Sequence, residues 1–300
     1  MTNFEIEILN KIRENISSFF DSLFKFITNF GGQEILILTI LVVYFVFSKK
    51  QGQRIAFSIF TSLLVNNSLK VVVDRIRPFN HPNATYPVEE AVREHASGMS
   101  FPSGHAQNAA VTYSSIAFSY KKNYLWIISS ILILLVGLSR VILGVHYPTD
   151  VIIGIILGVV LAYFGLKLHE KYENDFKNQI RLYLIVAIIF LPFLFIYLNK
   201  LKTNYFEYKD LFTIYSFYIG YILAVLLEKK YLDFDESVHL KFRIIRAIIA
   251  IIIVLGLLIG LKAVFPKDNI IFDMIRYFML SFVAIGVYPI ILKNSLFKKN

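Results

Sequence analysis

The sequence contains no cysteine, so disulfide bonds and thiolate chemistry are excluded. Charge is also scarce: only 17% of the 300 residues are charged, whereas 56% are hydrophobic and the mean hydropathy is +0.61. A soluble globular domain has about 25% charged residues. The shortage of charge and the excess of apolar residues therefore predict an integral membrane protein.

Other features that the sequence lacks narrow the class of protein further. The first 15 residues mix both signs of charge and lack an apolar stretch ahead of a small-residue cleavage site, so we expect no cleavable signal peptide. No His-x-x-x-His pair or similar metal-ligand spacing occurs, so we expect no metal or other cofactor. The net charge is +10, but Lys and Arg lie at the ends of apolar segments. Lipid head groups, and not nucleic acid, are the expected partners of these cations.

Long apolar segments predict an all-α, polytopic bundle of about nine transmembrane helices, since about 20 residues make a helix of about 30 Å. The expected spans are residues 34–48, 54–73, 104–120, 124–143, 149–168, 180–199, 211–227, 244–264 and 273–293. Residues 4–30 carry apolar residues every three to four positions with charges between them. This pattern predicts one amphipathic helix lying in the membrane interface.

Lysine and arginine positions predict the orientation. With these spans, 17 of the 31 lysines and arginines fall on one side of the membrane and 14 on the other. Lys70, Arg77 and Arg140, which belong to the 14, are candidates for a site, which leaves 11. The positive-inside rule then places the loops that hold His105 and His146 on the non-cytoplasmic side, and we expect a plasma membrane of the bacterial type.

A first candidate stretch, Met99–Asn108 (MSFPSGHAQN), lies at the start of an apolar segment. Pro102, Ser103 and Gly104 are turn and helix-start residues, so we expect His105 on the first turn of a helix that continues to Tyr120. Free backbone N–H groups and the helix dipole favour an anion there. The alternative is a histidine with a structural role at a helix start.

A second candidate group lies at the end of the second span. Lys70 and Arg77 are seven residues apart, so they share one helix face as long as the helix persists. Together they suit an anion. The alternative is that Lys70 pairs with Asp74 while Arg77 extends to the membrane interface.

The third group surrounds the start of the fifth span. Ser139 and Arg140 precede His146, and Asp150 follows it. Asp150 is near enough to accept a hydrogen bond from one imidazole nitrogen, which leaves the other free to attack. The alternative is that Asp150 only complements the dipole of a helix start. His81 and His95, in the long loop between the second and third spans, are expected to be solvated loop residues.

Together these residues form a pattern: Lys70, six residues, Arg77-Pro78; Pro102-Ser103-Gly104-His105; then Ser139-Arg140, five residues, His146, three residues, Asp150. The pattern resembles the three-part signature of the type 2 phosphatidic acid phosphatase (PAP2) superfamily, in its membrane-embedded lipid phosphatase branch. The resemblance covers about residues 30–168. We therefore expect an interfacial helix at 1–30, a catalytic core at 31–168 and a transmembrane extension of unknown role at 169–300.

The resemblance implies a metal-independent phosphatase that acts on a phosphomonoester or pyrophosphate of a membrane lipid. His146 would be the nucleophile that forms a phosphohistidine, Asp150 would orient it, and His105 would serve as general acid and then base. The phosphoryl oxygens would be held by Lys70, Arg77, Ser103, Gly104 and Arg140.

The sequence leaves other readings open. The phosphohistidine could be discharged onto a hydroxyl, which would make the protein a lipid phosphotransferase. A head-group transporter or flippase is the alternative from another class, although broken helices in paired halves are missing. The substrate stays open among undecaprenyl pyrophosphate, phosphatidylglycerol phosphate, phosphatidic acid and a sphingoid phosphate, and a homo-oligomer is also left open.

Overall fold

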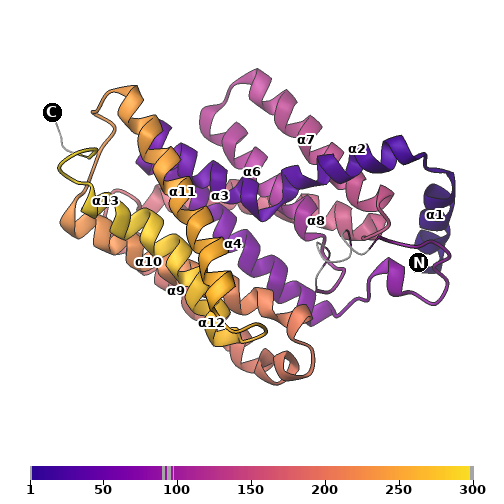
Figure 1. Cartoon of the computed structure of the whole chain (residues 1–300). Helices are drawn as coiled ribbons and strands as arrows, with labels where there is room; N and C mark the ends of the chain where they lie inside the picture. Colours follow the sequence, from indigo (N-terminus) through magenta and orange to yellow (C-terminus); the bar gives the residue numbers. More distant parts are fainter. Residues whose placement is uncertain (1, 90–91, 93–95, 97, 298–300) are drawn as a thin grey trace. The chain divides into compact units, whose positions relative to one another are not determined.

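The computed structural model describes residues 2–89, 92, 96 and 98–297, and the regular structure assigned among them is helical, without strands (Figure 1). The predicted all-α membrane fold is therefore confirmed. His81 is half-buried, and its Nδ1 accepts a hydrogen bond from the backbone N–H of Asn83. His95 lies outside the described residues.

Seven helical segments of the described chain are long and apolar enough to cross a membrane, and an eighth results if two segments bent by 45° form one span. The first helices of these seven segments are α4 (Lys49–Val73), α7 (Asn123–Ile142), α8 (Pro148–Tyr172), α9 (Phe176–Thr203), α10 (Tyr205–Tyr231), α11 (Leu240–Val264) and α12 (Ile270–Ser281). The segment of α12 continues through η4 (Phe282–Val287) into α13 (Tyr288–Ile291). The bent pair consists of α2 (Ser18–Thr28) with η1 (Asn29–Gly31), and α3 (Gln33–Val42) with η2 (Val43–Phe47). The expected nine spans included residues 104–120, but α6 (Gly104–Tyr120) has only 17 residues and buries polar side chains such as Gln107 and Asn108.

The N-terminal segment forms two helices where the sequence predicted one. Helix α1 (Thr2–Asn15) ends ahead of Ser17, whose backbone is extended, and α2 then begins at Ser18. The apolar face of α1 packs inward: Ile6 and Leu9 are at most 1% exposed and contact a cluster that includes Val145 and Tyr147. The segment is helical with an apolar face, as its spacing predicted, but part of the apolar face of α1 packs against other residues of the protein.

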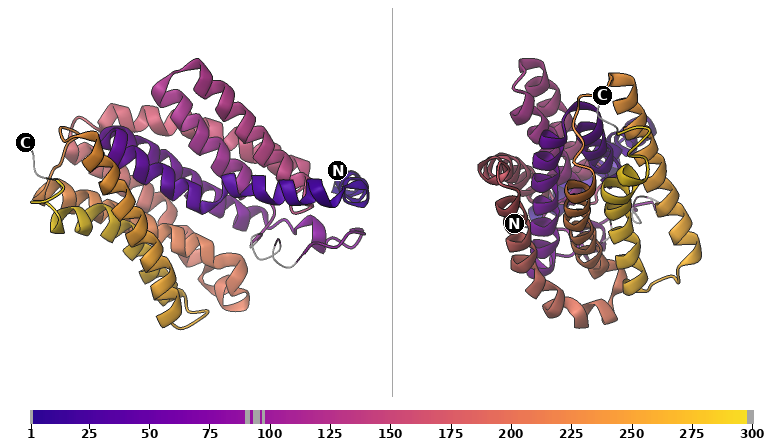
Figure 2. Two further views of the ribbon diagram at one scale, coloured as in Figure 1. Left: turned by 45° about the horizontal axis from the view of Figure 1, so that its top comes forward. Right: turned by 90° about the vertical axis from the view of Figure 1, so that its left-hand side faces the viewer.

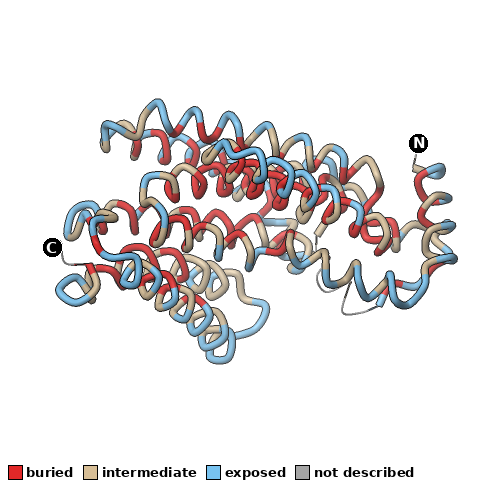
Figure 3. The backbone as a smooth tube through the Cα atoms, turned by 90° about the horizontal axis from the view of Figure 1, so that it is seen from above, coloured by how far each residue is buried: buried red, intermediate tan, exposed pale blue. Residues whose placement is uncertain are grey.

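The chain divides into two compact units, Met1–Leu36 with Thr61–Leu166, and Ile37–Phe60 with Lys167–Asn300. Helix α4 contributes its first half to the second unit and its second half to the first. Along most helices buried and exposed turns alternate, as the red and pale blue segments of Figure 3 show. The domain limits expected from the sequence, at residues 30 and 168, stay a prediction.

In the first unit, α6 and α7 form an antiparallel pair, shown in magenta in Figure 1. Ala110 and Tyr113 from α6 pack against Ile133 and Val136 from α7. Helix α8 approaches α6 through Gly158, where an added Cβ would lie 2.5 Å from the Ala110 Cβ and 2.6 Å from the Gln107 carbonyl oxygen. Only glycine permits this approach, which places the start of α8 beside the start of α6.

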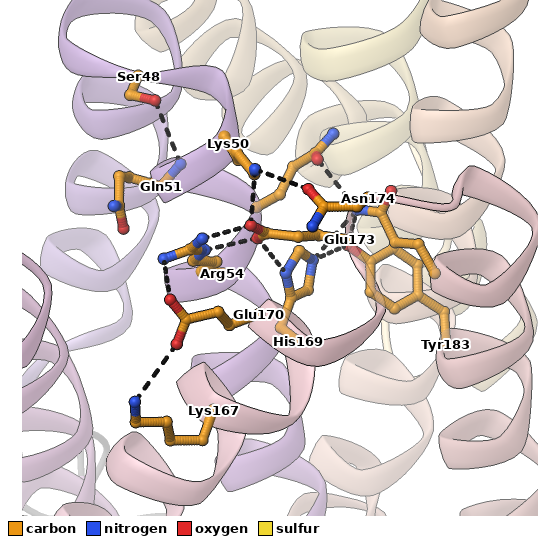
Figure 4. A network of polar contacts seen from close by, with 12 residues as sticks. Ser48, Lys50, Gln51, Arg54, Lys167, His169, Glu170, Glu173, Asn174 and Tyr183 are labelled. Carbon is orange, nitrogen blue, oxygen red and sulfur yellow. Dashed lines mark hydrogen bonds and ion pairs between the residues drawn. The ribbon is translucent and has the colours of Figure 1, made fainter.

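In the second unit, α10 packs against α9 and α12, and its Tyr218 and Tyr221 are fully buried. Figure 2 shows α11 and α12 as the two arms of a hairpin. A polar network joins the start of α4, the end of α8 and the first part of α9 (Figure 4). At its centre the Glu173 carboxylate accepts from Arg54, from Lys50 at 2.9 Å and from His169 Nδ1 at 3.3 Å, while Tyr183 OH lies 2.7 Å from His169 Nε2.

Candidate active site

His146 lies in the short connection between α7 and α8. The chain turns there at Gly144, which has a φ of +69°. The carbonyl oxygen of Arg140 accepts from the backbone N–H groups of Val145 and His146 at 3.2 and 3.3 Å. These bonds fold the connection back on the end of α7 and bury His146, which is 1% exposed.

The two imidazole nitrogens of His146 have different partners. Nδ1 lies 3.5 Å from Asp150 Oδ2 and 3.4 Å from Ser100 Oγ, whereas Nε2 lies 3.0 Å from Arg77 Nη1. A guanidinium can only donate and a carboxylate accepts, so these partners assign the proton to Nδ1 and the lone pair to Nε2. Burial holds the pKa of His146 well below its usual 6.5, and the charges of Arg77, Arg140 and Lys70 lower it further. The resting imidazole is therefore neutral, with a nucleophilic Nε2.

Asp150 is held on both carboxylate oxygens and is fully buried. Oδ2 accepts from Ser100 Oγ at 2.5 Å and from the Tyr147 backbone N–H at 3.0 Å, and Oδ1 accepts from Arg75 Nη1 at 2.6 Å. Sequence reasoning assigned no role to Ser100 or Arg75. Both lie in the stretches that it singled out, but nothing in a single sequence marks them as partners of a carboxylate 50 and 75 residues away.

Lys70 and Arg77 both reach the site, but the helix does not persist between them, so the shared helix face expected on that condition does not form. Helix α4 ends at Val73, Asp74 has a φ of +53°, and Arg77 has an extended backbone. Arg77 is 5% exposed, and it donates from Nε to the Gly98 carbonyl at 2.8 Å and from Nη1 to the Val145 carbonyl at 3.0 Å. Arg77 therefore does not extend to the membrane interface. Lys70 Nζ lies 3.8 Å from the Cβ position of Gly104.

Ser103 and Arg140 bring buried donors to the same place. Arg140 is 1% exposed and donates from Nη1 to Thr28 Oγ1 at 2.6 Å, while its Nε and Nη2 have no hydrogen-bond partner among the described residues. Ser103 precedes the first residue of α6 without capping it, and in the described part of the chain its buried Oγ is also unpaired. Unpaired buried donors are costly, and an anion between them would satisfy them.

His105 lies on the first turn of α6, as the sequence predicted, and the helix continues to Tyr120. Its imidazole is partly exposed and interacts electrostatically with Arg140, His146, Lys70 and Arg77. The structure thus brings all the predicted site residues together within the first unit, around His146. Apart from the Asp150 carboxylate beside Nδ1 of His146, the predicted charged side chains that gather there are Lys70, Arg77 and Arg140, and such cations suit a phosphoryl anion better than a metal ion.

Comparisons with known proteins identify similar phosphatases. Residues 52–174 match the PAP2 superfamily, and residues 212–299 match the transmembrane extension of PAP2 superfamily phosphatases. Undecaprenyl-diphosphatase of Sulfolobus acidocaldarius is 30% identical over 168 residues, which are 56% of this chain and 79% of the relative. Phosphatidylglycerophosphatase B of Bacillus subtilis is 34% identical over 161 residues, 49% of this chain and 74% of the relative.

One solved structure is also similar, the crystal structure of a transmembrane PAP2-type phosphatidylglycerolphosphate phosphatase from Bacillus subtilis. It shares 29% sequence identity at a TM-score of 0.47, and the similarity covers 56% of this chain and 86% of that chain.

Proposed function

Because the chain belongs to the PAP2 superfamily, we propose that it is an integral membrane lipid phosphatase that works through a phosphohistidine on His146. The observation that carries the proposal is the pair of contacts on that imidazole. Nδ1 faces Asp150 at 3.5 Å, and Nε2 lies beside the Arg77 guanidinium at 3.0 Å. A neutral imidazole held in this way presents its lone pair to an anion bound by the cations.

The first step is attack of His146 Nε2 on the phosphorus of the lipid phosphate. The bond from phosphorus to the lipid oxygen, or to the phosphate bridge of a pyrophosphate, breaks as the N–P bond forms. His105 gives its proton to the departing oxygen, and the phosphoryl dianion favours the protonated His105 that this requires. Asp150 stabilises the positive charge that develops on the His146 ring.

The second step releases phosphate. His105, now neutral, takes a proton from a water molecule, which attacks the phosphorus and breaks the N–P bond. In both steps the phosphoryl oxygens contact the group of donors proposed to hold them, namely Lys70, Arg77, Arg140, Ser103 Oγ and the Gly104 backbone N–H. Such preorganised donors stabilise the charge of the transition state without reorganising.

The names of the relatives suggest the substrate class. Undecaprenyl-diphosphatase and phosphatidylglycerophosphatase B both act on membrane lipids that carry phosphate, so we infer a lipid phosphate or pyrophosphate as substrate here. The charge distribution supports a site on the non-cytoplasmic side of a plasma membrane. Residues 212–299, which match the transmembrane extension, accompany the catalytic region without contributing a motif.

The test is phosphate release by the purified protein in detergent from undecaprenyl pyrophosphate, phosphatidylglycerol phosphate and phosphatidic acid. EDTA is present throughout, and vanadate serves as a transition-state probe. His146→Asn is expected to abolish release and His105→Asn to lower it by a factor of about 1,000. The matched control is His239→Asn, because exposed His239 only caps α11 by accepting from the Lys241 N–H at 3.2 Å, which asparagine can also do.

A radiolabelled substrate adds a direct readout. The wild type is expected to trap an acid-labile phosphoenzyme that His146→Asn lacks. Transfer of the label to an added alcohol in place of water would indicate a phosphotransferase. Full turnover in His146→Asn, or strict dependence on a divalent metal, would refute the mechanism.

A further inference from the structure

Helix α1 carries a buried carboxylate, that of Glu5, which has no role in the steps proposed above. Glu5 is 4% exposed although it lies near the chain end. Its Oε1 accepts from the backbone N–H of Thr149 at 3.0 Å and from Thr149 Oγ1 at 2.8 Å. Glu5 therefore satisfies a free N–H group on the first turn of α8, one residue before Asp150.

The other oxygen of Glu5 binds Arg75. Arg75 Nη2 donates to Glu5 Oε2 at 2.7 Å, and Arg75 Nη1 donates to Asp150 Oδ1 at 2.6 Å. The guanidinium also lies 3.7 Å above the centre of the Tyr147 ring. Arg75 thus bridges two carboxylates that lie far apart in the sequence, and its guanidinium plane packs on an aromatic face.

These contacts form one chain of charges from α1 to the nucleophile: Glu5, Arg75, Asp150, His146. Asp150 can hold the His146 Nδ1 proton only while Oδ2 faces the ring, and rotation about its last bond would turn Oδ2 away. Ser100 Oγ and the Tyr147 N–H hold Oδ2, and Arg75 adds to this restraint by binding Oδ1 with a charged group. Glu5 in turn prevents Arg75 from moving, because a guanidinium fork bound at both arms has one orientation.

We propose that Glu5 and Arg75 are positioning residues for His146, so that helix α1 contributes a functional residue to the active site. The proposal rests on the proposed function and adds residues to it. In the described part of the chain, the Glu5 side chain hydrogen-bonds to Thr149 and Arg75, and the Arg75 side chain to Glu5, Asp150 and Thr149 Oγ1, and none of these partners is a donor proposed to bind the phosphoryl group. Their loss should therefore slow the attack of His146 without weakening substrate binding.

Glu5 also sets the charge that Asp150 experiences. With Glu5 ionised, the charge of Arg75 is shared between two carboxylates. Without it, Arg75 acts on Asp150 alone, and Asp150 stabilises the positive imidazole ring of the phosphohistidine less well. Glu5→Gln keeps the shape of the side chain and one hydrogen-bond acceptor but removes the negative charge, so it tests the effect of that charge most directly.

The experiment measures kcat and KM for Glu5→Gln in the full-length protein, with the most active lipid from the panel. We expect kcat to fall about 10-fold to 100-fold and KM to stay within about twofold. The matched control on the same helix is Glu7→Gln, because Glu7 is 64% exposed and pairs only with Lys11 one turn on. Glu7→Gln should retain wild-type kcat and KM.

A second set of variants tests whether Glu5 acts through Arg75. In an Arg75→Ala background, Glu5→Gln should change kcat by less than about twofold, because Arg75, through which Glu5 is proposed to act, is already absent. An equal loss in both backgrounds would overturn the relay, and so would a rise of KM with unchanged kcat. A merely structural role of Glu5 would lower the yield and melting temperature of folded protein but leave the kcat of the folded fraction unchanged.

Failure of this proposal is distinct from failure of the proposed function. If the wild type releases no phosphate from any lipid, or if His146→Asn is as active as the wild type, the proposed function fails. If the wild type is active, His146→Asn is inactive and Glu5→Gln equals the wild type, only the relay fails.

Discussion

Three cationic side chains, Lys70, Arg77 and Arg140, act electrostatically on His146, and their charge lowers the pKa of its imidazole. A buried, cationic environment disfavours a charged imidazole and suits a phosphoryl anion. The same groups thus keep the His146 imidazole neutral and suit the phosphoryl group of the proposed substrate. At the scale of single residues, the proposed nucleophilic attack and the proposed binding of phosphate therefore have the same electrostatic cause.

The pH dependence of kcat/KM should show this directly. His146 must be neutral to attack, and its pKa lies well below 6.5 because of burial and neighbouring charge. Activity is therefore expected to persist as the pH falls through 6.5 and to be lost only below it. The measurement is the acid limb of kcat/KM for the free enzyme between about pH 4 and 8. An acid limb centred at or above pH 6.5 would contradict the assignment of His146.

At the scale of elements, close contact between helix backbones positions the residues of α6. Helix α8 touches the turn ahead of α6 at Gly154, where an added Cβ would lie 2.8 Å from the Ser103 carbonyl oxygen. The hydrogen bond from the Ser103 N–H to the Asp150 carbonyl at 3.0 Å joins the same two elements. The distance between the two catalytic histidines proposed above therefore depends on a glycine that carries no chemistry.

Gly154→Ala should accordingly damage activity. The added methyl group must displace the Ser103 turn by several tenths of an ångström, so we expect kcat/KM to fall about tenfold or more and stability to fall by about 1–3 kcal/mol. Gly256→Ala in α11 is the matched control, because nothing lies within 4 Å of its Cβ position. That variant should keep full activity. Equal behaviour of the two variants would show that α8 and α6 do not need this approach.

The network around Glu173 predicts a pH-dependent stability in the second unit (Figure 4). Burial alone would raise the pKa of Glu173, but hydrogen bonds from Arg54, His169 and Lys50 hold it below its usual 4.5. A carboxyl whose folded-state pKa is lowered contributes stability above its usual pKa, and this contribution is lost as the pH falls toward the folded-state value.

Glu173→Gln should therefore cost about 2 kcal/mol at neutral pH, because buried donors lose their acceptor. The difference in melting temperature between the variant and the wild type should shrink as the pH falls below 4.5. Glu170→Gln is the control, since Glu170 is 48% exposed and binds the outer side of Arg54. A constant difference down to pH 3 would refute the assignment of charge to Glu173.

At the scale of the whole molecule, the C-terminal helices are not simply appended to a complete core. Residues 37–60 belong to the second unit, although they precede every motif. Phe57 stacks on Tyr183 at 5.6 Å between ring centres, and Phe60 contacts Tyr221 at 4.9 Å. The first half of α4 thus packs on α9 and α10, while its second half carries Lys70 toward the site.

Truncation after Lys171 is therefore expected to lower stability, not merely to change the substrate range. It would remove the aromatic partners of Phe57 and Phe60 and leave half of α4 without its packing. We expect a lower yield of monodisperse protein and a fall in melting temperature of at least several degrees, with the loss of activity following the loss of folded protein. A truncated chain as stable and active as the wild type would show that the first unit is self-sufficient.

Some of this molecule could be predicted from the sequence because the relevant signals are local. Scarce charge and long apolar runs determined the helical membrane class. His105, His146 and Asp150, with their cations, could be proposed as candidates because the motifs that hold them are short stretches with fixed spacing. The start of α6 at Gly104 followed from turn residues alone.

The rest depended on contacts between distant parts of the chain. The helix ends at Val73, so Lys70 and Arg77 reach the site by different paths, and a helical period cannot show where a helix stops. Glu5 was one charge among several in an amphipathic segment, and only packing of Ile6 and Leu9 brings it to Arg75 and the start of α8. The sequence by itself determined the membrane class and the candidates for the chemistry; the tertiary structure alone decided which carboxylates and cations contact those candidates, because such pairing is set by how helices pack and not by spacing along the chain.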